Sequence, residues 1–174
     1  MGSNGKGITM KLSKTSVLSW VVILWISKVF LLSLPYKFTL HPDTQHIFGT
    51  IGQWMKGFIG ESGGALFMNY GAYAVGAVEL LTVLILLSPA LFFVLKKSGL
   101  MSNPPNIHLL HVVGGALASM VMAGAVFFHL FTPLGVEVIH EGKSDGGSLF
   151  YAAASILVLG AFMALINLIK VRRS

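Results

Sequence analysis

Four long apolar runs constrain the fold of this chain more than any other feature of its sequence. They extend roughly from Val17 to Pro35, Tyr70 to Leu95, His108 to Phe131 and Ser148 to Ile169. Each has about 19 to 26 residues, and an α-helix of ~20 residues spans a hydrocarbon core of ~30 Å. Lipid offers the peptide backbone no hydrogen-bond partners, so such segments cross a membrane as helices. The sequence therefore predicts an all-α membrane protein built as a four-helix bundle.

The charged residues predict the orientation of this bundle. They make up only 10% of the chain, well below the ~25% of soluble domains, and they are segregated by sign. Basic residues precede the first run, lie in the middle loop between the second and third runs, and follow the fourth run. Five of the six acids lie in the two loops on the opposite side: Asp43, Glu61, Glu137, Glu141 and Asp145. The positive-inside rule then predicts that both termini and the middle loop face the cytoplasm. The net charge of +6 is explained by this topology, and we find no basic patch typical of nucleic-acid binding.

The chain divides into three predicted parts. Residues 1–15 are expected to form a flexible cytoplasmic lead, residues 16–170 a single transmembrane domain, and residues 171–174 a basic cytoplasmic tail. The first outer segment, from Tyr36 to Asn69, is too long for a bare turn. Its middle, DTQHIFGTIGQWMKGFIGE, places apolar residues on one helical side, which predicts a short amphipathic helix in the first outer loop. The following GESGGA is expected to be a flexible tether.

Two ionisable residues lie deep within the apolar runs, Glu79 and Lys28. Such residues are costly in a membrane unless they are paired, and they often mark functional sites. Counted from the outer surface, both lie ~10–14 Å deep at 1.5 Å per residue, so a Lys28–Glu79 ion pair is geometrically allowed. The pair would either fix the register of two helices or provide a carboxylate for proton or quinol chemistry.

A candidate cavity near the outer surface involves three more residues. His129 lies near the outer end of the third run, at a depth that Lys37 and Trp54 of the first outer segment can reach. An acid, an imidazole and a stacked aromatic ring suit a quinone headgroup, whose two carbonyls need proton donors on reduction. We therefore predict Glu79 and His129 as proton-handling groups and Lys37, Trp54 and Lys28 as binding residues, in a cavity formed by the first three membrane helices. The alternative for His129 is a hydrogen-bonded residue inside the bundle.

Other cofactors are disfavoured. The chain has no cysteine, which excludes thiol–disulfide chemistry and thiolate-ligated iron–sulfur clusters. His108 and His111 share one face of the third run and could reach a metal from the same side, but they cannot bind a haem from opposite sides. No metal site is predicted, and interfacial solvation of His108 and His111 is the favoured interpretation.

Four segments carry a family resemblance: YKFTLHPDTQHIFGTIG, GAVELLTVLILLSP, MAGAVFFHLFTPLGVEV and DGGSLF. In this order and spacing, over about Tyr36 to Phe150, they resemble the DoxX-like family of small bacterial membrane proteins. The resemblance implies a four-helix bundle in the bacterial inner membrane, and it matches Lys37, Glu79 and His129 to the family pattern. Relatives include a subunit similar to that of thiosulfate:quinone oxidoreductase. This chain departs from many relatives in having only lysines before the first helix, and it lacks the cysteines of the methylamine-utilisation maturation branch.

These observations favour an integral membrane protein that is a subunit or partner of a redox system, with a quinone-type cavity near the outer side. They do not decide whether the protein is itself an enzyme. Two alternatives stay open: a non-catalytic structural or assembly subunit, and a small oligomeric transporter. The expected partners are the lipid bilayer and a membrane protein or further copies of this chain, with no nucleic acid.

Overall fold

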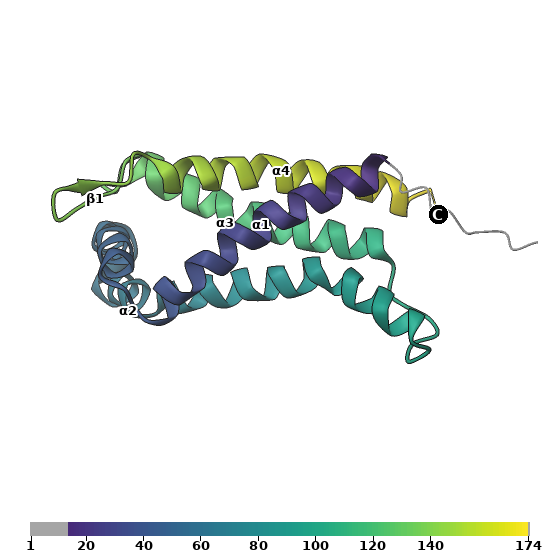
Figure 1. The fold of residues 1–174 in the computed structure, drawn as a ribbon. Helices are drawn as coiled ribbons and strands as arrows, with labels where there is room; N and C mark the ends of the chain where they lie inside the picture. Colours follow the sequence, from purple (N-terminus) through teal and green to yellow (C-terminus); the bar gives the residue numbers. More distant parts are fainter. Residues whose placement is uncertain (1–13, 174) are drawn as a thin grey trace, which may run out of the picture.

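The fold is an assembly of four helices, described by a computed structural model for residues 14–173 (Figure 1). The helices are α1 (Lys14–Phe38), α2 (Pro42–Lys97), α3 (Ile107–Phe131) and α4 (Ser148–Val171), and a two-stranded hairpin, β1 (Ile139–His140) with β2 (Lys143–Ser144), precedes α4. Each helix contains a segment long and apolar enough to cross a membrane. The prediction of an all-α membrane protein with four spans is confirmed, and the predictions for residues 1–13 and 174 lie outside the described part of the chain.

Helix α2 consists of two arms that meet at Gly60. The backbone of Gly60 has φ 80° and ψ 169°, outside the helical range, and the first arm lies across the end of the bundle while the second runs along it (Figure 1). The predicted helix in this loop is therefore present. The predicted tether is wrong: Glu61 to Ala65 are already helical, because one glycine makes the turn. The arms also pack closely, since a methyl group at Gly52 would lie 2.8 Å from the Gly64 carbonyl oxygen.

Apolar side chains fill the centre of the bundle and also cover its outer surface. All four helices contribute to the core, whose most buried members include Ile23, Ile26, Phe30, Leu86, Ala118, Ile156 and Met163. Large apolar residues such as Leu24, Leu84 and Leu165 are exposed on the outside. A helix that is apolar on every side suits a lipid environment, because its outer face then meets hydrocarbon instead of water.

The two ends of the bundle differ in charge. The start of α1, the loop after α2 and the end of α4 lie at one end, whereas the crosswise arm of α2 and the hairpin lie at the other (Figure 1). Lys97 and Arg172 thus lie at the first end, with no acid among the described residues there, whereas Asp43, Glu141 and Asp145 lie at the second end together with a few lysines such as Lys143. The fold agrees with the charge segregation, and which end faces the cytoplasm stays a prediction of the positive-inside rule.

Asp145 joins the hairpin to the start of α4. Its Oδ1 accepts the Val138 and Gly147 N–H groups at 2.8 and 2.9 Å, and its Oδ2 accepts the Leu149 N–H group at 3.0 Å. Burial favours the neutral carboxyl, but these backbone donors outweigh it and hold the pKa of Asp145 below its ordinary value of 3.8. The stabilisation is therefore present above the ordinary pKa and is lost as the pH falls through the lower value of the folded state.

Replacing Asp145 with Asn is expected to lower the free energy of unfolding by about 1–2 kcal/mol at neutral pH, because charge-assisted hydrogen bonds become neutral ones. In acid this difference in unfolding free energy should vanish, since the wild-type carboxyl group is then neutral, like the asparagine amide. Thermal unfolding of the wild type and Asp145→Asn in detergent across this pH range tests the idea. A difference that stays constant from neutral pH into acid would contradict it.

Candidate functional site

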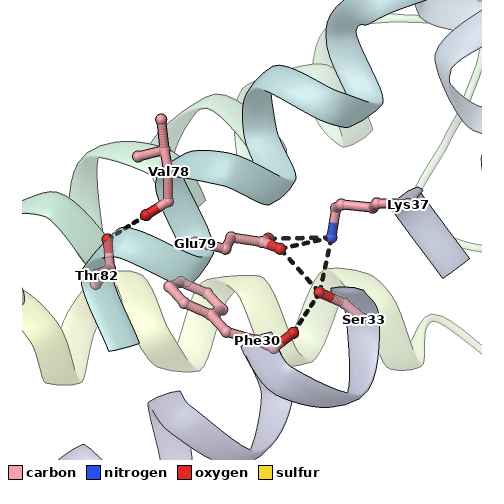
Figure 2. Close-up of polar contacts among 6 residues, drawn as sticks. All are labelled: Phe30, Ser33, Lys37, Val78, Glu79 and Thr82. Atoms are coloured by element: carbon pink, nitrogen blue, oxygen red, sulfur yellow. Dashed lines mark hydrogen bonds and ion pairs between the residues drawn. The ribbon is translucent and has the colours of Figure 1, made fainter. Parts of the chain in front are cut away.

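The buried carboxylate of Glu79 is bound by two residues of α1 (Figure 2). Glu79 is 2% exposed, and the Lys37 Nζ lies 2.8 Å from its Oε2 and 3.1 Å from its Oε1. The Ser33 hydroxyl lies 2.8 Å from the same Oε2 and also accepts a hydrogen bond from Lys37 at 2.8 Å. Glu79 is therefore paired with a cation and a hydroxyl inside the bundle.

The hydroxyl of Ser33 has one proton and two acceptors within reach. The Phe30 carbonyl oxygen and Glu79 Oε2 both lie 2.8 Å from it, so donation to one weakens donation to the other (Figure 2). The nearby Thr82 hydroxyl takes no part, because it donates to the Val78 carbonyl of its own helix. A carboxylate, an ammonium group and a hydroxyl that can change acceptor are the groups needed for short-range proton transfer.

Helical spacing and one small residue explain how this cluster assembles. Ser33 and Lys37 are four residues apart, so they lie on the same face of α1. Gly76 lies about one turn before Glu79 on α2 and faces the end of α1. A methyl group at Gly76 would lie 3.3 Å from the Phe38 ring and 3.5 Å from the Lys37 Cβ, so the absence of a side chain there makes room for the lysine.

The predicted pairing of Lys28 with Glu79 is wrong. Lys28 is exposed, and its Nζ lies 5.9 Å from the centroid of the Trp25 ring. Lys28 and Lys37 are nine residues apart, or about two and a half helical turns, so they point to opposite sides of α1. The depth count favours Lys28, but α1 runs on to Phe38, and only Lys37 is on the side that faces α2 and Glu79.

His129 and Trp54 lie apart from this cluster. The His129 Nδ1 is 2.6 Å from the Gly135 carbonyl oxygen, and its ring meets the edge of Phe150 at 5.8 Å. His129 is thus a hydrogen-bonded residue inside the bundle, beside an apolar cavity of about 160 Å³. Trp54 contacts Phe58 and Phe127. None of the hydrogen bonds, ion pairs or ring contacts of residues 14–173 joins either residue to Glu79.

The groove that reaches the cluster has different walls from those predicted. Its volume is about 450 Å³, and it lies between α1, the crosswise arm of α2 and the start of α4, without α3. Its lining is mostly apolar, but Ser33, Lys37, Asp43 and Asp145 contribute polar groups. Ser33 is not among the predicted site residues. Its spacing of four residues from Lys37, which places both on one face of α1, is the sequence signal for it. A neighbouring cavity of about 440 Å³, lined in part by the hairpin, shares Asp43, Ile47, Asp145 and Leu149 with this groove.

The site can bind a polar group at the end of an apolar groove and exchange protons with it. Lys37 is 15% exposed and lines the groove, whereas Glu79 lies behind it, out of contact with the groove. Comparisons with protein-family models, with curated proteins and with solved structures gave no match to this chain. The conclusion that stands on the fold is a small multi-pass membrane protein with four candidate spans.

Proposed function

We propose that this protein is a subunit or partner of a membrane redox system, and that its groove binds the headgroup of a quinone-type molecule. One observation carries the proposal: a lysine and a serine, backed by a buried carboxylate, line an otherwise mostly apolar groove. Ligand sites commonly have about 300–1,000 Å³, apolar walls and a few polar groups that orient the ligand. The groove fits this description.

The polar groups suit the chemistry of a quinone carbonyl. The Lys37 ammonium can donate a hydrogen bond to a carbonyl oxygen in the groove while it keeps its contact with Glu79. On reduction the ring takes up two electrons and two protons. The electrons would come from a partner protein of the redox system. The Lys37–Ser33–Glu79 cluster would deliver one proton to the carbonyl in the groove, and the second carbonyl would take its proton from water at the outer surface.

The resemblance to the DoxX-like family supports the same setting. It implies a bacterial inner-membrane protein, and the charge segregation adds that both termini are cytoplasmic. In that orientation the groove lies near the outer surface, where a membrane-dissolved ligand can enter sideways between α1 and α4. The alternative of a structural subunit has its own support, because every oxygen of Glu79 already has a partner within the bundle.

Analysis of what the protein carries after purification tests the proposal. Protein extracted under mild conditions should contain a quinone, and Ala152→Phe should remove most of it, because the new ring occupies the groove. Ala116→Phe is the matched control, since Ala116 is exposed on α3 and does not line the groove. Bound phospholipid in place of quinone, or a groove closed by side chains in an experimental structure, would favour the structural role instead.

Glu79→Gln separates proton handling from helix packing. The amide keeps the size of the side chain and can still accept hydrogen bonds, so the protein should fold and retain its quinone. Its quinone-linked proton uptake should fall by about 10²-fold or more, as for loss of a general acid–base group. Unchanged proton uptake in a reconstituted system would remove Glu79 from the chemistry.

A further inference from the structure

Another large cavity lies at the end of the bundle opposite to the groove at Lys37. Its volume is about 490 Å³, and all four helices contribute to its walls. Most of the lining is apolar, with Trp20, Pro89 and Phe93 among the contributors, and the polar groups come mainly from His108, His111 and Asn167. Among residues 14–173, none that lines it is a lysine, an arginine or an acid.

His111 is buried in the wall of this cavity without a hydrogen-bond partner. It is 3% exposed, and within residues 14–173 neither ring nitrogen has a hydrogen bond. The ring meets Trp20 edge-on at 6.1 Å. The predicted interfacial solvation is therefore wrong for His111, because it lies on the stripe of α3 that also carries the buried Gly115 and Ala118. A buried polar group without a partner is costly and rare, so this imidazole needs an explanation.

The polar neighbours of His111 are already occupied. Asn167 donates to the Ser19 hydroxyl at 3.1 Å and to the Met163 carbonyl at 2.8 Å. Its Oδ1 lies 2.8 Å from the His108 Nδ1, so the network assigns that nitrogen as the donor. A neutral His108 then keeps its Nε2 as an acceptor. This network fixes His108 and Asn167 beside the cavity, and neither makes a hydrogen bond of normal geometry to the ring nitrogens of His111.

The path of α2 explains why the cavity exists. Helices α1 and α2 lie close together near Lys37 and Glu79 and diverge toward the other end of the bundle (Figure 1). Pro89 lies on this path, and its ring nitrogen cannot make the normal hydrogen bond to the Ile85 carbonyl. The Ser88 hydroxyl donates to that carbonyl at 2.7 Å and so replaces the missing bond. The turn after Pro89 then provides Phe93 and Val94 to the cavity wall.

We propose that this cavity is a second binding site, for the ring of a neutral quinone or quinol, and that His111 is its polar contact. A neutral imidazole offers one donor and one acceptor, so it can donate to a quinone carbonyl or accept from a quinol hydroxyl. The absence of charged lining residues disfavours phospholipid headgroups and fatty acids. Among residues 14–173 no three His, Asp or Glu side chains are placed to hold a metal ion. The inference does not depend on the groove at Lys37, which shares no lining residue with this cavity.

Fluorescence of Trp20 tests the site directly. In a Trp25→Phe, Trp54→Phe background, Trp20 is the remaining tryptophan, and duroquinone added to the protein in phosphatidylcholine nanodiscs should quench it to saturation. His111→Leu should weaken binding about tenfold or more, the effect of losing one hydrogen bond in an apolar site. Ala90→Phe, which fills the cavity without touching a polar group, should abolish it. His46→Leu makes the same change at the other end and should leave binding unaltered.

The melting temperature of His111→Leu distinguishes a ligand-binding role of His111 from a structural one. A histidine that only supports the fold should destabilise the protein when replaced, whereas removal of an unpartnered buried imidazole should leave Tm unchanged or raise it. Equal quenching in the parent, His111→Leu and Ala90→Phe proteins, or a lower Tm for His111→Leu, would overturn the proposal. Loss of quenching in Ala152→Phe alone would place the ligand in the groove at Lys37. The two proposed binding sites are therefore tested independently of each other.

Discussion

Lys37→Met is expected to destabilise the protein by about 3–5 kcal/mol, because it leaves the carboxylate of Glu79 buried without its cation. Glu79 is 2% exposed, and Ser33 would be its only remaining partner among those described. A serine hydroxyl cannot replace an ammonium group, since it has a single proton that the Phe30 carbonyl also attracts. The methionine keeps the length and the apolar part of the lysine side chain, so the loss reports the charge.

Replacing Glu79 instead of Lys37 should destabilise the protein less. In Glu79→Gln the lysine remains charged, but Lys37 is 15% exposed and its amine borders the groove, where it can reach water or a ligand. A loss of about 1–2 kcal/mol is expected, as for weakened charge-assisted hydrogen bonds. The two partners of one ion pair therefore differ in the effect of their removal, because one has access to solvent and the other does not.

The double variant Lys37→Met, Glu79→Leu should recover most of the stability, since an apolar pair in place of a buried ion pair is often neutral or better. Reversible unfolding in mixed micelles measures the coupling in a double-mutant cycle of the wild type, Lys37→Met, Glu79→Leu and the double variant. If Lys37→Met cost less than Glu79→Gln, then Glu79 would not be the buried partner. If the double variant were also inactive in quinone-linked proton uptake while fully stable, the pair would serve chemistry and not packing.

The sequence predicts that Glu79 is paired, but not which lysine pairs with it. Glu79 was recognised as a paired acid because it interrupts a long apolar run. Its partner is Lys37 and not the predicted Lys28, because α1 runs on to Phe38 and only Lys37 has the helical phase that faces Glu79. The structure gives this phase: Phe30 is buried, and Lys37 follows it by seven residues, about two turns, whereas Lys28 does not share this face. The sequence does not mark it, because the run around Lys28 is apolar on every side of the helix.

The same lesson applies to His111 and to the start of α2. His111 lies near a helix end, which suggested solvation, but it also continues the spacing of three and four residues that marks the buried side of α3, with Gly115, Ala118 and Met122. The bend at Gly60 could not be predicted. The segment GESGGA is polar and small, as in a loop, and it becomes helical because the two arms of α2 pack against each other at Gly52 and Gly64.

Gly115→Ala is expected to destabilise the protein by about 2–3 kcal/mol, because α3 and α4 touch there through their backbones. The added methyl group would lie 2.7 Å from the Gly160 carbonyl oxygen and 3.2 Å from the Ala164 nitrogen. Backbone atoms cannot rotate away as a side chain can, so the two helices must separate along their contact. The surface of α3 at Gly115 is thus a close-packing surface, and its partner is the glycine of α4, Gly160.

Gly124→Ala on the same helix is the matched control, since a methyl group there would meet nothing within 4 Å. It should be neutral or stabilise the helix by up to about 1 kcal/mol, because alanine is the better helix former. Opposite signs for one substitution at two positions of α3, measured by reversible unfolding, would show that helix contact and not glycine content sets the stability. Equal effects would instead mean that α3 and α4 are not in backbone contact at Gly115. His108, His111 and Asn167 are held on these two helices, so the cavity that they line would then have a different geometry.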